Sequence, residues 1–229
     1  MKLVLTCEHA FPDIPEKYKQ LFLKDINVLK THEAYDPGAF DVFQKLKILG
    51  DVSHYQKIGR LLIEINRSEW HRSLLSRFSE TLTVKQKKAL LDTYYIPYRN
   101  GVIRSIKELI DAGDRVVHIS IHSFTPVLYC KERSADIGLL YDPQRKDEKQ
   151  FARKWKGLLL NNFQDLKVRF NYPYLGRSDG FTTSLRKLFP ENYVGIELEV
   201  NQKWVSGNKL DDSLKHAIFR TIKELKEKP

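Results

Sequence analysis

Short apolar runs separated by amphipathic stretches are the feature of this sequence that most constrains its fold. Short runs of apolar residues between polar segments are typical of strands buried on both faces of a sheet. We expect such strands at Lys2–Cys7, Arg60–Ile65, Arg115–Ile121, Gly138–Tyr141 and Val194–Val200. The stretches between them have apolar residues near the helical period, and predict helices at Phe40–Leu49, Val84–Tyr95, Tyr98–Ala112, Lys149–Asn162 and Ser213–Lys226. This alternation predicts an α/β fold, with a mostly parallel sheet covered by helices on both faces.

The chain shows no repeat, no linker and no shift in composition, so we expect one domain over residues 1–229. Apolar residues make up 41% and charged residues 30%, a composition that excludes a disordered chain. No apolar run approaches the roughly 18 residues of a membrane helix, and the first apolar run is too short for a secretory signal. Two cysteines, Cys7 and Cys130, form no disulfide framework. We therefore expect a cytoplasmic protein that does not bind membranes.

The formal net charge of +10 raises the question of nucleic-acid binding. The basic residues are spread along the chain, and no known nucleic-acid motif accompanies them. A dispersed basic surface is more typical of solvated helix faces, so we expect no nucleic-acid partner. A non-catalytic binding module with a basic surface remains the alternative to an enzyme.

Polar side chains follow the predicted strands at the edge where a parallel sheet carries its site. His9 follows the first strand, and His122 lies at the end of the third. Neutral imidazole is a common zinc ligand, and a catalytic zinc takes three protein ligands plus water. The third ligand would be a carboxylate, from Glu8 or Asp36, and the spacing does not choose between them.

Two further groups at strand ends suit hydrolysis of a substrate that carries a carboxylate. Asn66 and Arg67 could bind that carboxylate, since arginine grips it with two parallel hydrogen bonds; the alternative is a structural Arg67 paired with Glu64. Glu197 and Glu199 alternate along the last predicted strand and therefore share one face. A carboxylate beside a metal can take the proton of the attacking water.

Two side chains could act as the nucleophile in place of water. Ser123 lies next to His122 and could form a Ser-His-Asp arrangement, although the chain has no Gly-x-Ser-x-Gly turn. Cys7 stands beside Glu8 and His9, although a cysteine on a buried strand is more often packing than nucleophile.

With these residues in view, the chain resembles the N-formylglutamate amidohydrolase family, in the branch whose first motif reads Cys-Glu-His. The matching segments occur in the family's order along nearly the whole chain. They are 6–10, 35–39, 60–68, 97–99, 121–128, 136–141, 171–174 and 195–201. The string His-Ser-Phe-Thr-Pro at 122–126 is the most specific of them.

The resemblance implies a three-layer α/β/α sandwich with a mixed central sheet, the fold of zinc exopeptidases and of phosphorylase/hydrolase-like proteins. It implies one Zn²⁺ per chain on His9 and His122, although other first-row divalent ions suit the same ligands. It favours Asp36 as the third ligand, with Glu8 behind it or in its place. The exopeptidase pattern His-x-x-Glu is absent because Pro12 occupies its last position.

The resemblance also assigns roles in catalysis and substrate binding. It favours Glu199 over Glu197 as the base, and Asn66 with Arg67 as the carboxylate-binding pair. Arg67 would also help to stabilise the oxyanion. We add Ser123 and Tyr174 as candidate substrate contacts; Tyr174 lies in the segment 163–183, which we expect to be a loop that shapes the pocket.

The implied reaction is hydrolysis of the amide bond of an N-formyl amino acid such as N-formylglutamate, a small-molecule substrate. The same chemistry on another N-acyl amino acid or on a small peptide is the alternative. Relatives often have Asp in place of Glu64 and His in place of Arg99, and the second difference could alter substrate choice.

Overall fold

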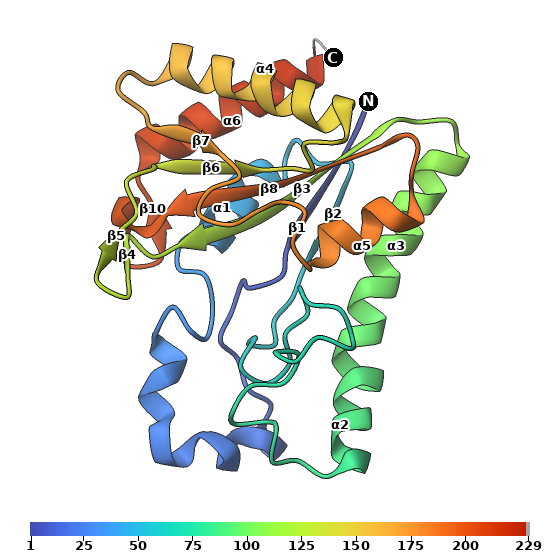
Figure 1. The fold of residues 1–229 in the computed structure, drawn as a ribbon, viewed down its shortest axis with the longest axis vertical. Helices are drawn as coiled ribbons and strands as arrows, with labels where there is room; N and C mark the ends of the chain where they lie inside the picture. Colours follow the sequence, from blue (N-terminus) through green and yellow to red (C-terminus); the bar gives the residue numbers. More distant parts are fainter. Residues whose placement is uncertain (228–229) are drawn as a thin grey trace.

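A six-stranded mixed sheet forms the centre of the molecule in the computed structural model, which describes residues 1–227 (Figure 1). Its strand order is β2-β1-β3-β8-β6-β7. The strands are β1 (Lys2–Cys7), β2 (Val52–Tyr55), β3 (Val116–Phe124), β6 (Ile137–Leu140), β7 (Val168–Phe170) and β8 (Tyr193–Asn201). Every neighbouring pair is parallel except β6 and β8, which are antiparallel. The expected mostly parallel, mixed sheet is confirmed.

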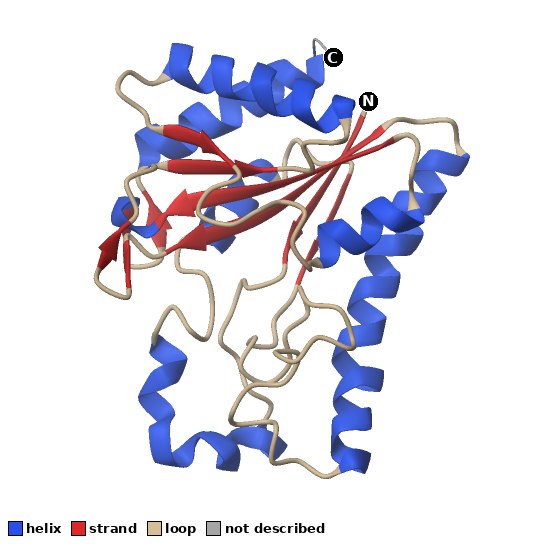
Figure 2. Ribbon diagram, viewed as in Figure 1, coloured by secondary structure: helices blue, strands red, loops and turns tan. Residues whose placement is uncertain are grey.

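Helices cover both faces of this sheet (Figure 2). One face packs against α1 (Ala39–Leu46), α4 (Lys146–Asn162) and α6 (Asp212–Glu227). The other packs against α3 (Ile96–Asp111) and α5 (Phe181–Leu188). A short helix, α2 (Val84–Leu90), continues through a π-helical turn at Leu91–Tyr95 into α3, and Thr83 caps its start as a capping box with Gln86. The three-layer α/β/α sandwich is confirmed.

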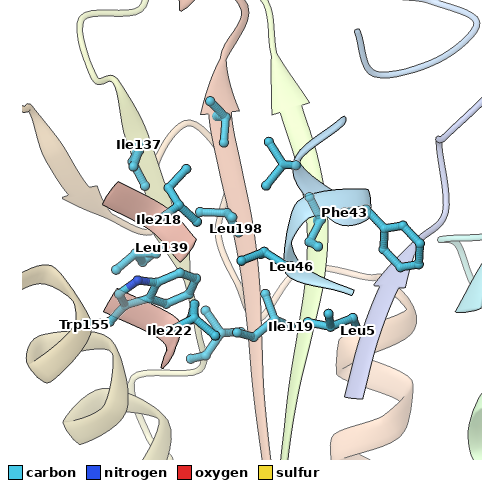
Figure 3. Packing of buried hydrophobic residues seen from close by; sticks show 14 of the residues in the cluster. Leu5, Phe43, Leu46, Ile119, Ile137, Leu139, Trp155, Leu198, Ile218 and Ile222 are labelled. Carbon is cyan, nitrogen blue, oxygen red and sulfur yellow. The ribbon is translucent and has the colours of Figure 1, made fainter. Parts of the chain in front are cut away.

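The main hydrophobic core lies between the sheet and the α1–α4–α6 layer (Figure 3). Ile119 of β3 and Leu198 of β8 point into it, and Trp155, Ile218 and Ile222 meet them from the helices. Strand residues alternate between faces, so the next residue in each strand points to the other layer. Burial of each such side chain stabilises the fold by about 1.5–3 kcal/mol.

A second hydrophobic cluster lies beyond the carboxyl edge of the sheet, where long connections and a 3₁₀ segment at Glu16–Lys30 meet (Figure 1). Phe22 from that segment packs with Leu62 and Ile63 from a connection without regular structure. Two small hairpins pair β4 (Val127–Leu128) with β5 (Lys131–Glu132) and β9 (Val205–Ser206) with β10 (Lys209–Leu210). A 3₁₀ turn at Gln202–Trp204 leads from β8 to β9.

The strand expected at Arg60–Ile65 is wrong, since that segment is a buried loop in the second cluster. The true second strand, β2, is less apolar and was missed because it lies at the edge of the sheet and is only partly buried. An apolar run indicates burial, and periodicity alone cannot tell a buried strand from a buried loop. The segment 163–183, expected to be a loop, contains β7 and the start of α5.

The other four predicted strands and all five predicted helices are present, with shifted ends. None of the described helices is long and apolar enough to span a membrane. Residues 228 and 229 lie outside the described part of the chain. The single domain over residues 1–229 stays a prediction.

Candidate active site

Three potential metal ligands meet at the carboxyl edge of the sheet. His9 lies just beyond β1, His122 lies near the end of β3, and Asp36 comes from the connection that precedes α1. Asp36 Oδ2 is 2.9 Å from Nδ1 of His122 and 3.3 Å from Nδ1 of His9. One ligand atom from each residue falls within 4.8 Å of the others, and all three residues are buried. Two imidazoles and a carboxylate are a donor set that suits a divalent cation such as zinc.

The remaining nitrogen of each imidazole is held by the protein. His9 Nε2 is 2.6 Å from Glu64 Oε1, and His122 Nε2 is 2.8 Å from Ser120 Oγ. Ser120 in turn donates to Glu8 Oε2 at 2.7 Å. Burial opposes ionisation of Glu8, but hydrogen bonding and attraction to His122 prevail and hold the pKa of Glu8 well below its usual range.

These contacts indicate that the Nε2 atom of each imidazole carries a proton. An ionised Glu8 can only accept hydrogen bonds. The Ser120 hydroxyl therefore donates a hydrogen bond to Glu8 and accepts one from Nε2–H of His122. Glu64 likewise accepts from Nε2–H of His9. Asp36 can likewise only accept, so Nδ1–H of His122 donates to it. Burial opposes protonation of His122, but its hydrogen bonds to Asp36 and Glu8 raise its pKa well above the usual value. A cation held by this group would take the place of the Nδ1 protons. Metal-ligating histidines are typically oriented in this way, by a carboxylate or hydroxyl on the far nitrogen.

The sequence left two candidates for the third metal ligand, Asp36 and Glu8, and in the structure they lie in different positions around the histidines. Asp36 faces the Nδ1 atoms of both histidines. Glu8 lies on the opposite side of His122, 3.4 Å from Nε2, and its other oxygen accepts from the Tyr98 hydroxyl. Glu8 is therefore placed to orient His122 from behind.

The alternative nucleophiles lack access or activation. A chain Ser120–His122–Asp36 has the spacing of a catalytic triad, but Ser120 is 1% exposed and its proton points to Glu8. The Ser123 hydroxyl donates to the Pro37 carbonyl and not to His122. Cys7 is buried, and burial raises the pKa of its thiol, which disfavours the reactive thiolate.

Arg60 balances the negative charge around the two histidines, a role that the sequence reasoning missed. Its guanidinium contacts Glu64 Oε2 at 2.7 Å and Asp36 Oδ1 at 3.3 Å. Burial would raise the pKa of both acids, but His9 and His122 lower the pKa of Asp36, and Arg60 and His9 lower the pKa of Glu64. The sequence carries no signal for this role, because four-residue spacing brings side chains together on a helix and residues 60–65 form a loop. Glu64 therefore pairs with His9 and Arg60, and not with Arg67 as in the alternative considered above.

Glu199 lies beside this group and has no hydrogen-bond partner for its buried Oε2. Its Cα pairs with that of His122 across β3 and β8, and its side chain lines the same cavity of about 200 Å³. Burial, with the nearby charges of Asp36 and Glu197, raises the pKa of Glu199 to about 8. Burial also raises the pKa of Glu197, which lines the cavity too. A carboxyl group with a pKa near neutrality is suited to accept and return a proton.

The predicted substrate-binding residues line the same cavity. Asn66, Arg67 and Tyr174 all line it, as does Ser123. Asn66 Oδ1 accepts from the backbone N–H of Phe181 at 2.9 Å, which ties this wall to the start of α5. Arg67 donates to the backbone carbonyl of Asp179. The candidate carboxylate-binding residues and the metal-ligand group therefore share one cavity.

Arg99 supports this wall from behind. Its guanidinium donates to the carbonyls of Ile65 and Arg67 at 3.1 and 3.2 Å and stacks on the Phe181 ring. The residue does not line the cavity, so its effect on substrate choice would act through the position of Arg67.

The fold and the site together define an α/β protein with a candidate metal centre at the carboxyl edge of a mixed sheet. Residues 1–205 match the model of the FGase family, N-formylglutamate amidohydrolase. The chain therefore belongs to the N-formylglutamate amidohydrolase family. The prediction of an enzyme, a hydrolase of a non-peptide carbon–nitrogen bond, is confirmed by this membership.

Two solved structures share the fold over nearly their whole length. The gene product Atu2144 from Agrobacterium tumefaciens is 27% identical, with a TM-score of 0.79 over 98% of this chain and 92% of that one. An N-formylglutamate amidohydrolase from Ralstonia eutropha JMP134 is 14% identical, with a TM-score of 0.71 over 99% of this chain and 94% of that one. No curated protein sequence matches the chain.

Proposed function

We propose that the protein is a zinc-dependent hydrolase that cleaves the amide bond of an N-acyl amino acid, with N-formylglutamate as the example that names its family. The observation that carries the proposal is the group His9–Asp36–His122, whose ligand atoms lie within 4.8 Å of one another beside Glu199. The alternative is the same hydrolysis reaction on a different N-acyl amino acid or on a small peptide.

His9, Asp36 and His122 would hold the metal through two imidazole nitrogens and one carboxylate oxygen. The residues fit such a group, because the Nδ1 atoms of both histidines and the Asp36 carboxylate converge, and because Glu199 Oε2 is buried without a partner. A bound divalent ion supplies a Lewis acid that lowers the pKa of water and polarises a carbonyl. Glu8 and Glu64 orient the two histidines for this task.

Glu199 is the proposed general base. It accepts a proton from the attacking water and then returns that proton to the leaving amine nitrogen. Its position in β8, next to His122 in β3, fixes the carboxylate beside the ligand group on a rigid element. Glu197, two residues earlier on the same face, raises the pKa of Glu199 by its charge.

Arg67 and Asn66 are the proposed site for the α-carboxylate of the substrate. Arginine offers a planar fork that matches a carboxylate, and the Asp179 carbonyl and Arg99 keep this part of the chain in place. Ser123 contributes through its backbone, since its N–H donates to Asp36 Oδ2 at 3.3 Å.

Metal analysis tests the proposal directly. Purified protein should contain about one zinc ion per chain, and His122→Ala should lose it because one of the three ligand residues is gone. His32→Ala is the matched control, since His32 is exposed and should not change the metal content. A wild-type protein that neither contains nor takes up zinc or another divalent ion would overturn the metal mechanism.

A further inference from the structure

The part of the chain that follows strand β8 lies against the connection that carries Asp36. Tyr35, the residue before Asp36, donates its hydroxyl proton to Asn208 Oδ1 at 2.8 Å. The backbone N–H of Leu210 donates to Asp41 Oδ2 at 3.0 Å, in the first turn of α1. Two segments that are far apart in the sequence are therefore joined on both sides of Asp36.

A glycine allows the closest approach between these two segments. Gly38 has a φ of 81°, in the left-handed region that favours glycine, and it directly precedes α1. A Cβ at this position would lie 2.6 Å from Cγ2 of Val205. The turn after Pro37 therefore packs directly on β9, with no room for a side chain between them.

A chain of hydrogen bonds runs from Gln202 to the residue that follows Asp36. Gln202 Nε2 donates to Ser123 Oγ at 3.0 Å, and Ser123 Oγ donates to the Pro37 carbonyl at 2.7 Å. A carbonyl only accepts, so the Ser123 hydroxyl uses its one proton on Pro37, and Gln202 must face Ser123 with its NH₂ group. The backbone N–H of Ser123 also donates to Asp36 Oδ2 at 3.3 Å. Ser123 therefore contacts this connection through both its backbone and its side chain.

Asp36 depends on such contacts more than the two histidines do, because it lies outside regular structure. His122 lies within β3, and His9 follows β1 by two residues. The Asp36 N–H donates to the His9 carbonyl at 3.0 Å, and the Asp36 carbonyl accepts from the N–H of Ala39 at 3.1 Å. Neither bond reaches the segment after β8, so the hydrogen bonds of Ser123 and Gln202 supply that connection.

From these contacts we propose that Gln202 is a positioning residue, which acts through the Ser123 hydroxyl to hold Asp36 in place as a metal ligand. The inference rests on the proposed function and assigns a supporting role at the same site. Gln202 does not line the cavity, so it acts on the site only through its neighbours. It lies three residues after Glu199, so one short segment carries both the proposed base and the support of a ligand. Residues that orient metal ligands in this way typically contribute about 10- to 100-fold in metal affinity or activity.

The zinc affinity of the full-length protein tests the inference independently of turnover. Gln202→Met keeps the length of the side chain and removes the amide donor, and the variant should fold because Gln202 is only partly buried. Competition with a chromogenic chelator should show zinc binding weakened by about tenfold. The visible absorption spectrum of cobalt-loaded protein should change too, because it reports the arrangement of ligands around the ion.

Lys203→Met is the matched control for a purely structural effect. Lys203 lies in the same 3₁₀ turn, is exposed and pairs with Asp136, a contact that does not involve Asp36. This variant should keep the zinc affinity and the cobalt spectrum of the wild type, even where urea unfolding shows a small loss of stability.

A double variant tests the route through Ser123. Ser123→Ala removes the hydroxyl and keeps the backbone N–H that donates to Asp36. It should weaken zinc binding at least as much as Gln202→Met does. Combining the two changes should add no further loss, because both interrupt the same chain of hydrogen bonds. Losses that multiply would overturn the route through Ser123.

Kinetics at saturating zinc separate positioning from substrate binding. Gln202→Met should lower kcat for N-formylglutamate and leave KM unchanged, since Gln202 does not line the cavity. A change confined to KM overturns the inference, as do a zinc affinity and a cobalt spectrum that equal those of the wild type. Either result leaves the proposed function intact. A wild-type protein that binds neither zinc nor cobalt overturns both.

Discussion

The two faces of the central sheet are built from the same strands and serve opposite purposes. On β3 and β8, Ile119 and Leu198 point into the core under α1, α4 and α6. Their neighbours Ser120 and Glu199 point to the other face, toward the α3–α5 side and the cavity. One face holds fully buried hydrocarbon, and the other, near its carboxyl edge, holds buried carboxylates and imidazoles.

This difference indicates how the molecule tolerates its site. Buried ionisable groups are costly unless they are paired, and Glu199 Oε2 has no partner. The apolar face supplies the stability that offsets this cost, and the period-2 alternation keeps the two requirements on separate residues. Mutations on the apolar face should therefore affect folding, and mutations on the polar face should affect turnover.

The largest expected effect is on the polar face, at the proposed base. Glu199→Gln should reduce kcat by about 10²- to 10⁴-fold, since the amide cannot take the proton of the attacking water. Stability should not fall, because Glu199 Oε2 has no hydrogen bond to lose and the amide has a similar shape. Steady-state kinetics, metal analysis and urea unfolding measure the three properties.

Glu197→Gln is the matched comparison for Glu199, since both acids share a face and line the cavity. We expect a much smaller loss of kcat in this variant. Normal turnover in Glu199→Gln with a severe loss in Glu197→Gln would move the role of base to Glu197.

The reverse result is expected on the apolar face. Leu198→Ala removes a side chain that is 0% exposed and packs in the main core. It should reduce the free energy of unfolding by about 2–5 kcal/mol through lost burial and the cavity left behind. Below its unfolding temperature the variant should keep its metal and most of its kcat. Loss of turnover as severe as that of Glu199→Gln in folded protein would contradict the division between the faces.

The division between the faces was visible in the sequence on the strands that carry the site. Alternation along 194–200 placed Glu197 and Glu199 together, and the ends of the first and third predicted strands located His9 and His122. The choice between Asp36 and Glu8 was not available from spacing, because it depends on where the connection before α1 returns to the sheet. Tertiary packing also hid the loop nature of 60–65, whose apolar residues lie in a cluster formed by distant segments. The role of Arg60 was hidden as well, since it depends on contact with the distant Asp36.

Stability against acid offers a test that separates the polar face from the core. His118 lies on the polar side of β3, fully buried between the Thr6 hydroxyl at 2.8 Å and the Tyr193 hydroxyl at 2.7 Å. Burial lowers its pKa to about 4, from an unfolded value near 6.5. Between these values the unfolded chain binds more protons than the folded one, so stability falls as pH falls.

The expected loss from His118 is about 2 kcal/mol between pH 7 and pH 5. His118→Gln keeps a hydrogen-bonding side chain but does not titrate, so its loss over the same interval should be smaller by about that amount. Urea unfolding at both pH values measures this difference. Equal losses in the two proteins would show that His118 is not the group that destabilises the fold in acid.

The smallest expected effect concerns a polar contact on the apolar side of the sheet. The Trp155 indole N–H donates to Thr221 Oγ1 at 3.0 Å between α4 and α6, and both residues are 0% exposed. Thr221→Val keeps the shape and leaves this N–H without a partner, which should cost about 1–3 kcal/mol. Thr221→Ser, which keeps the hydroxyl, controls for the lost acceptor. Urea unfolding should rank wild type and Ser above Val, with unchanged kcat in all three. A decrease in kcat for the Val variant at constant metal content would mean that the core layer and the active-site face are coupled across the sheet.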